Sequence, residues 1–277
     1  MSGKQTNFFA QALQQGAYAM QTRQFGRAEQ IATDILKSNR TDRHAVLLLA
    51  HALIGQNRAG EAITPLERIA RRSRDAEIET LLGASLCAAG RAADGIAQLR
   101  RTAARRPPYL PSFQELAGQL VKAGQIEDAK STIEAGLALV PESVDLKLDM
   151  GRLFHESCEL AKARDILTSA RDAAPGRPDV QTELGRILIL HGDYAAAADA
   201  FRAVLALRPD DASARAYLAT CLLEQGERDA GEAALRSVMR GRPNLLGRAA
   251  FVLAASSHGR FFFALAAVAK FLGGEGA

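Results

Sequence analysis

Prolines recur along this chain at a fixed interval of 34 residues, at Pro107, Pro141, Pro175, Pro209 and Pro243. Small residues keep the same interval in two further columns. The first column is Gly83, Ala117, Gly151, Gly185 and Ala219, and the second is Gly95, Ala129, Ala163, Ala197 and Gly231. A repeat of this length is the signature of an array in which each unit is one supersecondary motif that must stack on its neighbours.

Each unit reads as two amphipathic helices joined by a short turn. Within residues 178–211, Leu184 lies on one apolar stripe of helical spacing, and Phe201 and Val204 lie on a second. Gly192 separates the two stripes. The proline that closes each unit cannot continue the preceding helix, so it marks the boundary with the next unit.

The same phase extends to both ends of the printed sequence with weaker matches. The predicted units are 9–42, 43–75, 76–109, 110–143, 144–177, 178–211 and 212–245, with a terminal hairpin at 246–274. Ala, Leu, Arg, Glu and Gln dominate these segments and favour helix. The sequence therefore predicts an all-α solenoid of about seven to eight helix-turn-helix repeats, forming one domain over 1–277.

One unit carries the residues of a known repeat family. Leu184-Gly185, Gly192-Asp193-Tyr194, Ala197, Phe201 and Pro209 resemble the tetratricopeptide repeat pattern. The resemblance covers almost the whole chain. It departs at the family's aromatic position in the first helix, which is Gln181 in this unit and Phe113 in another. The two N-terminal units also lack the closing proline and have Arg40 and Arg74 there. The resemblance implies a right-handed superhelix whose first helices line a concave surface, and a role in protein binding.

Several function classes find no support in the sequence. There is no glycine-rich phosphate loop, nucleophile elbow or zinc-protease motif. The three cysteines, Cys87, Cys158 and Cys221, are far apart and show no metal-ligand spacing. No apolar run reaches the ~20 residues that a membrane-spanning helix needs. We therefore expect a soluble, cytoplasmic protein that is not an enzyme and has no metal, cofactor or small-molecule substrate.

Two arginines at equivalent positions of neighbouring repeats are the leading candidates for partner binding. If the family's geometry holds, Arg152 and Arg186 both point into the concave groove, where guanidinium groups bind carboxylates well. This suggests a peptide or protein ligand with acidic residues. Alternatively, the arginines pair with Asp149 and Glu183, three positions earlier on the same helices. The remaining groove candidates are Gln114, His155, Thr182 and Tyr217.

A second basic feature lies at the ends of two predicted second helices. It comprises Arg71, Arg72, Arg74, Arg100, Arg101, Arg105 and Arg106. Cations at such positions complement the helix dipole, which is the favoured interpretation. The rival interpretation is a ridge that binds an acidic surface or nucleic acid. Aromatic residues that could stack on bases are not interleaved there, which weighs against nucleic-acid binding.

The C-terminal segment is unusually apolar. Residues 260–272 include Phe261, Phe262 and Phe263 and would form a helix that is apolar on nearly every face. Successive residues of a helix point about 100° apart, so the three rings cannot all pack on one neighbouring repeat. We expect a second copy of the chain, a partner or a further domain to cover this helix, the first case being a homodimer. The alternative is that one or two rings stay partly exposed.

These features predict a protein-interaction scaffold or adaptor that binds a partner segment in its groove. The alternative is that the repeats are the substrate-recruiting arm of a larger transferase, whose catalytic domain would lie beyond Ala277.

Overall fold

The structure is a computed structural model that describes residues 3–239 and 243–273. The described helices of the first half are α1 (Gly3–Gln21), α2 (Phe25–Ser38), α3 (Arg43–Gly55), α4 (Ala59–Ala70), α5 (Ala76–Ala88), α6 (Ala92–Ala103), α7 (Leu110–Lys122) and α8 (Ile126–Leu139). Those of the second half are α9 (Val144–Glu156), α10 (Leu160–Ala173), α11 (Pro178–Leu190), α12 (Tyr194–Leu207), α13 (Ala212–Glu224), α14 (Arg228–Met239), α15 (Leu246–Ala255) and α16 (Leu265–Phe271), with a 3-10 turn at Pro243–Leu245.

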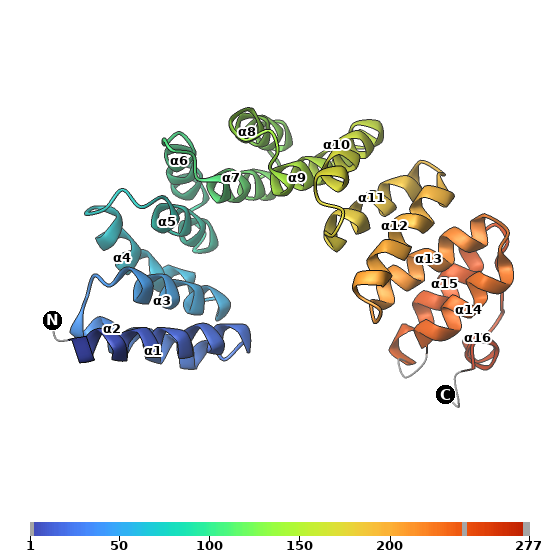
Figure 1. Cartoon of the computed structure of the whole chain (residues 1–277), viewed down its shortest axis with the longest axis horizontal. Coiled ribbons are helices and arrows are strands. Elements are labelled where there is room, and N and C mark those ends of the chain that lie inside the picture. Colours follow the sequence, from blue (N-terminus) through green and yellow to red (C-terminus); the bar gives the residue numbers. More distant parts are fainter. Residues whose placement is uncertain (1–2, 240–242, 274–277) are drawn as a thin grey trace. The chain divides into compact units, whose positions relative to one another are not determined.

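The helices pair in sequence order into seven hairpins, from α1–α2 to α13–α14, followed by a shorter terminal pair (Figure 1). The described residues contain no strand. The prediction of an all-α solenoid of helical repeats is confirmed. The first helix is longer than expected, because it begins at Gly3 rather than near residue 9.

The turn of every hairpin contains one residue with left-handed backbone. These residues are Arg23, Asn57, Gly90, Gly124, Cys158, Gly192 and Gly226, with φ between 56° and 82°. Four of them are glycine, which adopts this conformation without steric cost. Cys158 stands 34 residues after Gly124 and 34 before Gly192, in the same column of the repeat, and takes the same conformation as these glycines (φ 58°). The column is therefore a backbone requirement of the turn.

The column of small residues marks where the two helices of a hairpin approach most closely. A Cβ atom on Gly185 would lie 2.7 Å from Cζ of Phe201, and one on Gly151 would lie 2.5 Å from Cγ of Leu167. In both cases the facing side chain comes from the second helix of the same hairpin and is buried. Interiors packed this closely have no room for an added side chain.

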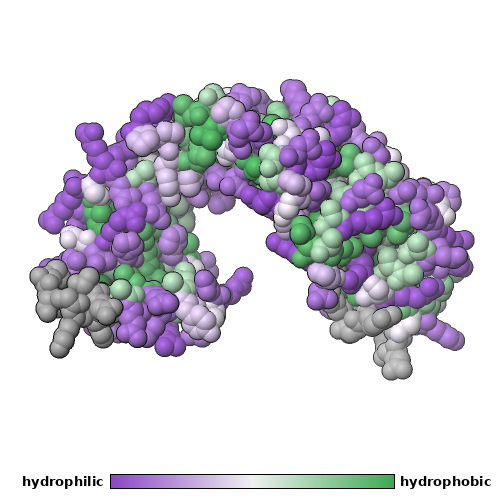
Figure 2. Space-filling model, in the orientation of Figure 1, coloured by the Kyte–Doolittle hydropathy of each residue, from purple (hydrophilic) through white to green (hydrophobic). Residues whose placement is uncertain are grey.

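The chain divides into two compact units, residues 1–141 and 142–277. Within each unit every first helix contacts the next first helix, as α5 contacts α3 and α7, whereas no two second helices contact each other. Figure 1 shows this in the first unit, where α5 and α7 lie on one side and α6 and α8 on the other. We call these sides the first-helix face and the second-helix face. Figure 2 shows hydrophilic residues over much of the visible surface of both units. A single solenoid over 1–277 stays a prediction.

Polar residues occupy the first-helix position at which the family carries an aromatic residue. Glu79, Lys147 and Gln181 each fill it and are each at least nine-tenths buried. Arg105 bonds to Glu79, the carboxylate of Glu142 pairs with Lys147, and Gln181 donates to the carbonyl oxygen of Pro175. A buried polar group must find such a partner. The departure from the family pattern is therefore accommodated by hydrogen bonds rather than by packing.

The C-terminal prediction was wrong about secondary structure. The last helix begins at Leu265, so Phe261, Phe262 and Phe263 lie in a non-helical segment. The physical reason is an anchor at its start, where Arg260 Nε donates to the buried Glu232 carboxylate at 2.6 Å. The neighbouring Gly259 carbonyl accepts a hydrogen bond from Arg228 at 2.8 Å. These contacts to α14 hold the segment in place of helical hydrogen bonds.

We predict that Gly185→Val destabilises the protein by about 2 kcal/mol, because the added methyl groups would displace the buried Phe201 ring. The matched control is Gly118→Val. Gly118 lies on the first helix α7, one residue after the column of small residues, and a Cβ atom there would meet nothing within 4 Å. The control should change the stability by less than about 0.5 kcal/mol. Chemical denaturation followed by circular dichroism measures both, and equal losses would contradict the proposed close approach.

Candidate functional site

The first-helix face of the second unit carries a row of alternating charges on α9 and α11. Arg152 Nη1 donates to Asp149 Oδ1 at 3.4 Å, and Arg152 Nε lies 3.6 Å from Glu183 Oε1. Arg186 Nη1 donates to Glu183 Oε2 at 3.0 Å. The pairs within each helix that the sequence suggested are therefore present. In addition, Glu183 joins the two arginines across neighbouring repeats. We call these four residues the charged row.

The arginines of the charged row keep unused binding capacity. Their side chains are 46% and 39% exposed for Arg152 and Arg186, whereas that of Glu183 is 16% exposed. A guanidinium group has five N–H donors, and each of these two donates one hydrogen bond within the protein. Glu183 thus fixes the positions of both guanidinium groups while leaving donors directed to solvent.

A further ion-pair cluster ties the N-terminal ends of α9 and α11 together. Arg177 donates to Asp145 Oδ1 at 2.8 Å and to Asp179 Oδ2 at 2.6 Å. The hydrogen bond from Arg177 lowers the pKa of Asp179 to about 2. The Asp179 carboxylate is therefore charged at neutral pH. This link and Glu183 together set the spacing of the two helices that bear the charged row.

The other groove candidates are less closely associated with the charged row. The ring of Tyr217 stacks on Phe201 with centroids 5.0 Å apart, and Arg248 lies over the same ring at 5.1 Å. The Thr182 hydroxyl donates to the carbonyl oxygen of Pro178 in the preceding turn of its helix. His155 is half-buried near the end of α9. Gln114 lies on α7, in the other unit.

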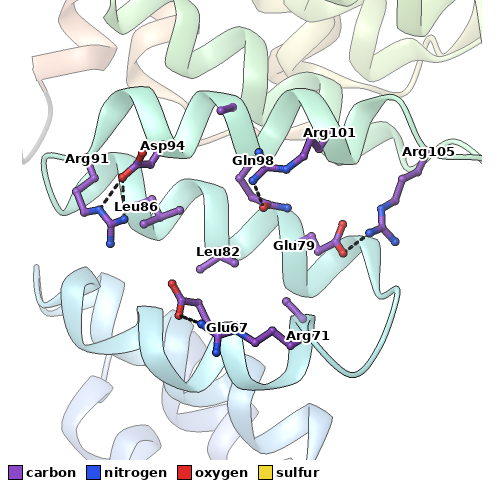
Figure 3. A pocket seen from close by; sticks show the side chains of 12 residues that line it. Glu67, Arg71, Glu79, Leu82, Leu86, Arg91, Asp94, Gln98, Arg101 and Arg105 are labelled. Atoms are coloured by element: carbon purple, nitrogen blue, oxygen red, sulfur yellow. Dashed lines mark hydrogen bonds and ion pairs between the residues drawn. The ribbon is translucent and has the colours of Figure 1, made fainter.

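The sequence did not indicate the cavities of the first unit, two of which are lined in part by residues of α5. One has a volume of about 460 Å³ and lies between the second helices α4 and α6, and residues of the first helix α5 also line it (Figure 3). The other, of about 590 Å³, lies at the loops before α5 and α7. Arginines from the predicted basic feature line both. The gap exists because the second helices do not contact each other. No local sequence pattern predicts this separation.

Part of the predicted basic feature is neutralised within the protein. Arg71 pairs with Glu67 at 3.1 Å, Arg100 with Asp128 at 2.9 Å, and Arg105 with Glu79 at 2.5 Å. The Arg100 pair joins α6 to α8, and the Arg105 pair joins the loop after α6 to α5. Both are therefore more specific than a general complement to the helix dipole. Among the described residues, Arg72 and Arg74 have no ion pair or hydrogen bond from their side chains.

Three properties of the described residues concern metal binding, thiol reactivity and membrane insertion. They contain no cluster of three or more His, Cys, Asp or Glu side chains that could hold a metal ion. Burial raises the pKa of the Cys221 thiol to about 12, which keeps it protonated and unreactive at neutral pH. Over the same residues, no helix has the length and apolar character to cross a membrane.

Comparisons with solved structures agree with this architecture. A tetratricopeptide repeat protein from Cytophaga hutchinsonii superposes with a TM-score of 0.61 at 16% identity, over 74% of this chain and 85% of that one. Human IFIT1, solved as a dimer with m7Gppp-AAAA, gives 0.61 at 14% identity, over 95% and 68%. The Cut9–Hcn1 hetero-tetramer of APC/C gives 0.56 at 16% identity, over 88% and 49%. At these identities the likeness concerns the fold. No curated protein matches the sequence.

The family model described as tetratricopeptide repeat matches residues 19–85, 120–187 and 188–250, which together are well over half of the chain. The repeat interval, the left-handed turn of every hairpin and the close approach at the small residues all agree with this match. The chain belongs to the tetratricopeptide repeat family.

Proposed function

We propose that this protein is a cytoplasmic interaction scaffold, or adaptor, that binds an acidic segment of a protein partner along the first-helix face of its second unit. The observation that carries the proposal is the charged row, in which the two exposed arginines of neighbouring repeats are both held by Glu183. The family consists in general of interaction modules rather than catalysts, which supports the scaffold role.

The charged row is suited to carboxylates because its arginines are ordered before a partner arrives. A flexible arginine loses side-chain entropy when it binds, and an arginine that is already held loses less. The remaining N–H groups of Arg152 and Arg186 can form paired hydrogen bonds to carboxylate oxygens. Asp149 and Glu183 balance the charge of the row, so a partner must present its carboxylates close to the guanidinium groups. This arrangement favours specific recognition over general attraction of anions.

Reversing both arginine charges should abolish this recognition. We expect Arg152→Glu/Arg186→Glu to weaken binding of the partner at least about tenfold, because two carboxylate contacts become repulsive. The measurement begins with capture of partners from source-cell lysate by the intact chain and their identification by mass spectrometry. Titration calorimetry with the purified partner then compares the variant with the unaltered protein.

The matched control for this experiment is Arg164→Glu/Arg202→Glu. These two arginines lie on the second helices α10 and α12 of the same hairpins, and each pairs with a nearby aspartate, Asp165 or Asp199. The control carries the same change in net charge and should keep its affinity. If the control lost binding equally, or if the row variant kept full affinity, the first-helix face of this unit would not be the binding surface.

We also propose that the non-helical C-terminal segment mediates self-association. Phe261 and Phe263 are 71% and 101% exposed, and their rings contact each other edge to face at 5.4 Å. Phe251 and Leu265 add further exposed apolar surface to this terminal pair of helices. Exposed apolar surface of this kind is a common feature of interaction sites. A second copy of the chain that covers it would form a homodimer.

Removing the two exposed rings should prevent this dimer. We expect sedimentation velocity over the micromolar range to show a monomer–dimer equilibrium for the unaltered protein and a monomer for Phe261→Ser/Phe263→Ser. Leu190→Ser is the control, because Leu190 is another exposed apolar residue of the same unit (54%), and it should leave the equilibrium unchanged. A protein that is monomeric at every concentration would rule out the dimer.

A further inference from the structure

The cavity between α4 and α6 has charged walls and an apolar middle. Glu67 of α4 and Arg71, which caps its C-terminus, lie on one side. Asp94 and Arg101 of α6 and Arg91, which caps its N-terminus, lie on the other (Figure 3). The apolar lining is Ala70, Leu82, Leu86 and Ala97. Binding sites commonly combine an apolar lining with a few polar groups, as this cavity does. The cavity therefore has the chemistry of a site that could bind a peptide segment.

The second cavity of the first unit adjoins this one, because Arg105 lines both. Arg74, Arg106 and Tyr109 also line it, together with the Pro107–Pro108 segment. Arg105 itself is held from the interior by Glu79, which is 4% exposed. We call the two cavities together the arginine trough. Its arginines come from α6 and from the loops that follow α4, α5 and α6, on the second-helix side of the unit.

The charges of the arginine trough do not balance. Three arginines pair with the three carboxylates of the walls: Arg71 with Glu67, Arg91 with Asp94 at 2.7 Å, and Arg105 with Glu79. Three arginines remain without a carboxylate among the described residues, namely Arg74, Arg101 and Arg106. Arg101 donates to the Gln98 side-chain oxygen at 2.7 Å, and Arg106 donates to main-chain carbonyl oxygens. The trough thus has three uncompensated cations, against a formal net charge of +4 for the whole chain.

We infer that the arginine trough is a second interaction surface, which binds a peptide segment carrying both acidic and large apolar residues. Carboxylates of the peptide would pair with Arg74, Arg101 and Arg106, and an apolar side chain would enter the cavity beside Leu82 and Leu86. The trough lies on the second-helix side of the first unit, so it is separate from the charged row on α9 and α11. The protein would then have two acid-binding surfaces, one in each unit.

The composition of the walls favours a peptide over a nucleic acid. Nucleic acids carry a negative charge at every phosphate, and the exposed carboxylates of Glu67 and Asp94 would repel a continuous backbone of this kind. Single-stranded nucleic acids also need aromatic rings for base stacking, and Tyr109 is the one aromatic residue that lines the two cavities. An acidic peptide with spaced carboxylates can meet the arginines and avoid these two groups.

The test uses the intact chain and a fluorescein-labelled dodecapeptide of repeating Asp-Leu-Glu, with binding followed by fluorescence anisotropy. We expect Arg74→Glu/Arg101→Glu/Arg106→Glu to bind this probe at least about tenfold more weakly than the unaltered protein. All three side chains are exposed, so the variant should fold, and its thermal unfolding confirms this. A second peptide with serine in place of leucine should bind at least about fivefold more weakly, because the cavity loses its apolar occupant.

The matched control is Arg164→Glu/Arg171→Glu/Arg202→Glu, which makes the same change in net charge on second helices of the other unit. It should keep the affinity for the probe. Arg152→Glu/Arg186→Glu should keep it as well, because Asp149 and Glu183 balance the charge of the row and leave it little general attraction for an acidic peptide. This result separates the trough from the charged row. Loss of binding in either variant to the same extent as in the trough variant would overturn the assignment. So would absence of binding by the unaltered protein, or displacement of the peptide by an oligothymidylate of equal charge at equal concentration.

Discussion

The close approach of the two helices within each hairpin is the contact on which the rest of this structure depends. Gly83, Gly151 and Gly185 have no room for a side chain, because Leu99, Leu167 and Phe201 from the second helix lie against them. A hairpin this narrow presents its first helix to the next hairpin along a continuous apolar stripe. The first helices of a unit therefore contact one another, while the second helices stay apart.

This asymmetry gives each unit two faces with different chemistry. On the first-helix face, neighbouring helices are close enough for a side chain of one repeat to pair with a side chain of the next, as Glu183 of α11 does with Arg152 of α9. On the second-helix face of the first unit, the gap between α4 and α6 becomes a cavity with side chains from both helices in its walls. The first-helix face thus carries an ordered row of charges, and the second-helix face contains a cavity. The two proposed binding modes follow from this difference.

The hairpins, their order and the left-handed turns could be predicted from the sequence because the repeat itself records them. The intrahelical pairs of Arg152 with Asp149 and of Arg186 with Glu183 were also predictable, since a spacing of three places such residues side by side. The pair of Arg105 with Glu79 was not, because its two members lie 26 residues apart and meet only once the hairpin has formed.

The wrong prediction of a helix at Phe261–Phe263 also arises from a contact between residues that are distant in the sequence. Phe261 and its neighbours have only a weak local preference for helix, and Arg260 donates to the buried Glu232 carboxylate of α14, so the helix starts later. Tertiary hydrogen bonds override weak local preferences of this kind. The arginine trough could not be predicted from the sequence for a related reason. Its arginines were visible as a group, but which of them keep a carboxylate partner depends on the packing of α4, α5 and α6.

The central claim, that a protein partner lies along the first-helix face of the second unit, can be tested most directly by site-specific photo-crosslinking. A benzophenone amino acid at position 155 replaces a histidine at the end of α9, and one at position 199 replaces an aspartate on the second helix α12. The account predicts that the partner cross-links to the protein labelled at 155 and not to that labelled at 199. Cross-linking at 199 alone would contradict it and would place the partner on the opposite face.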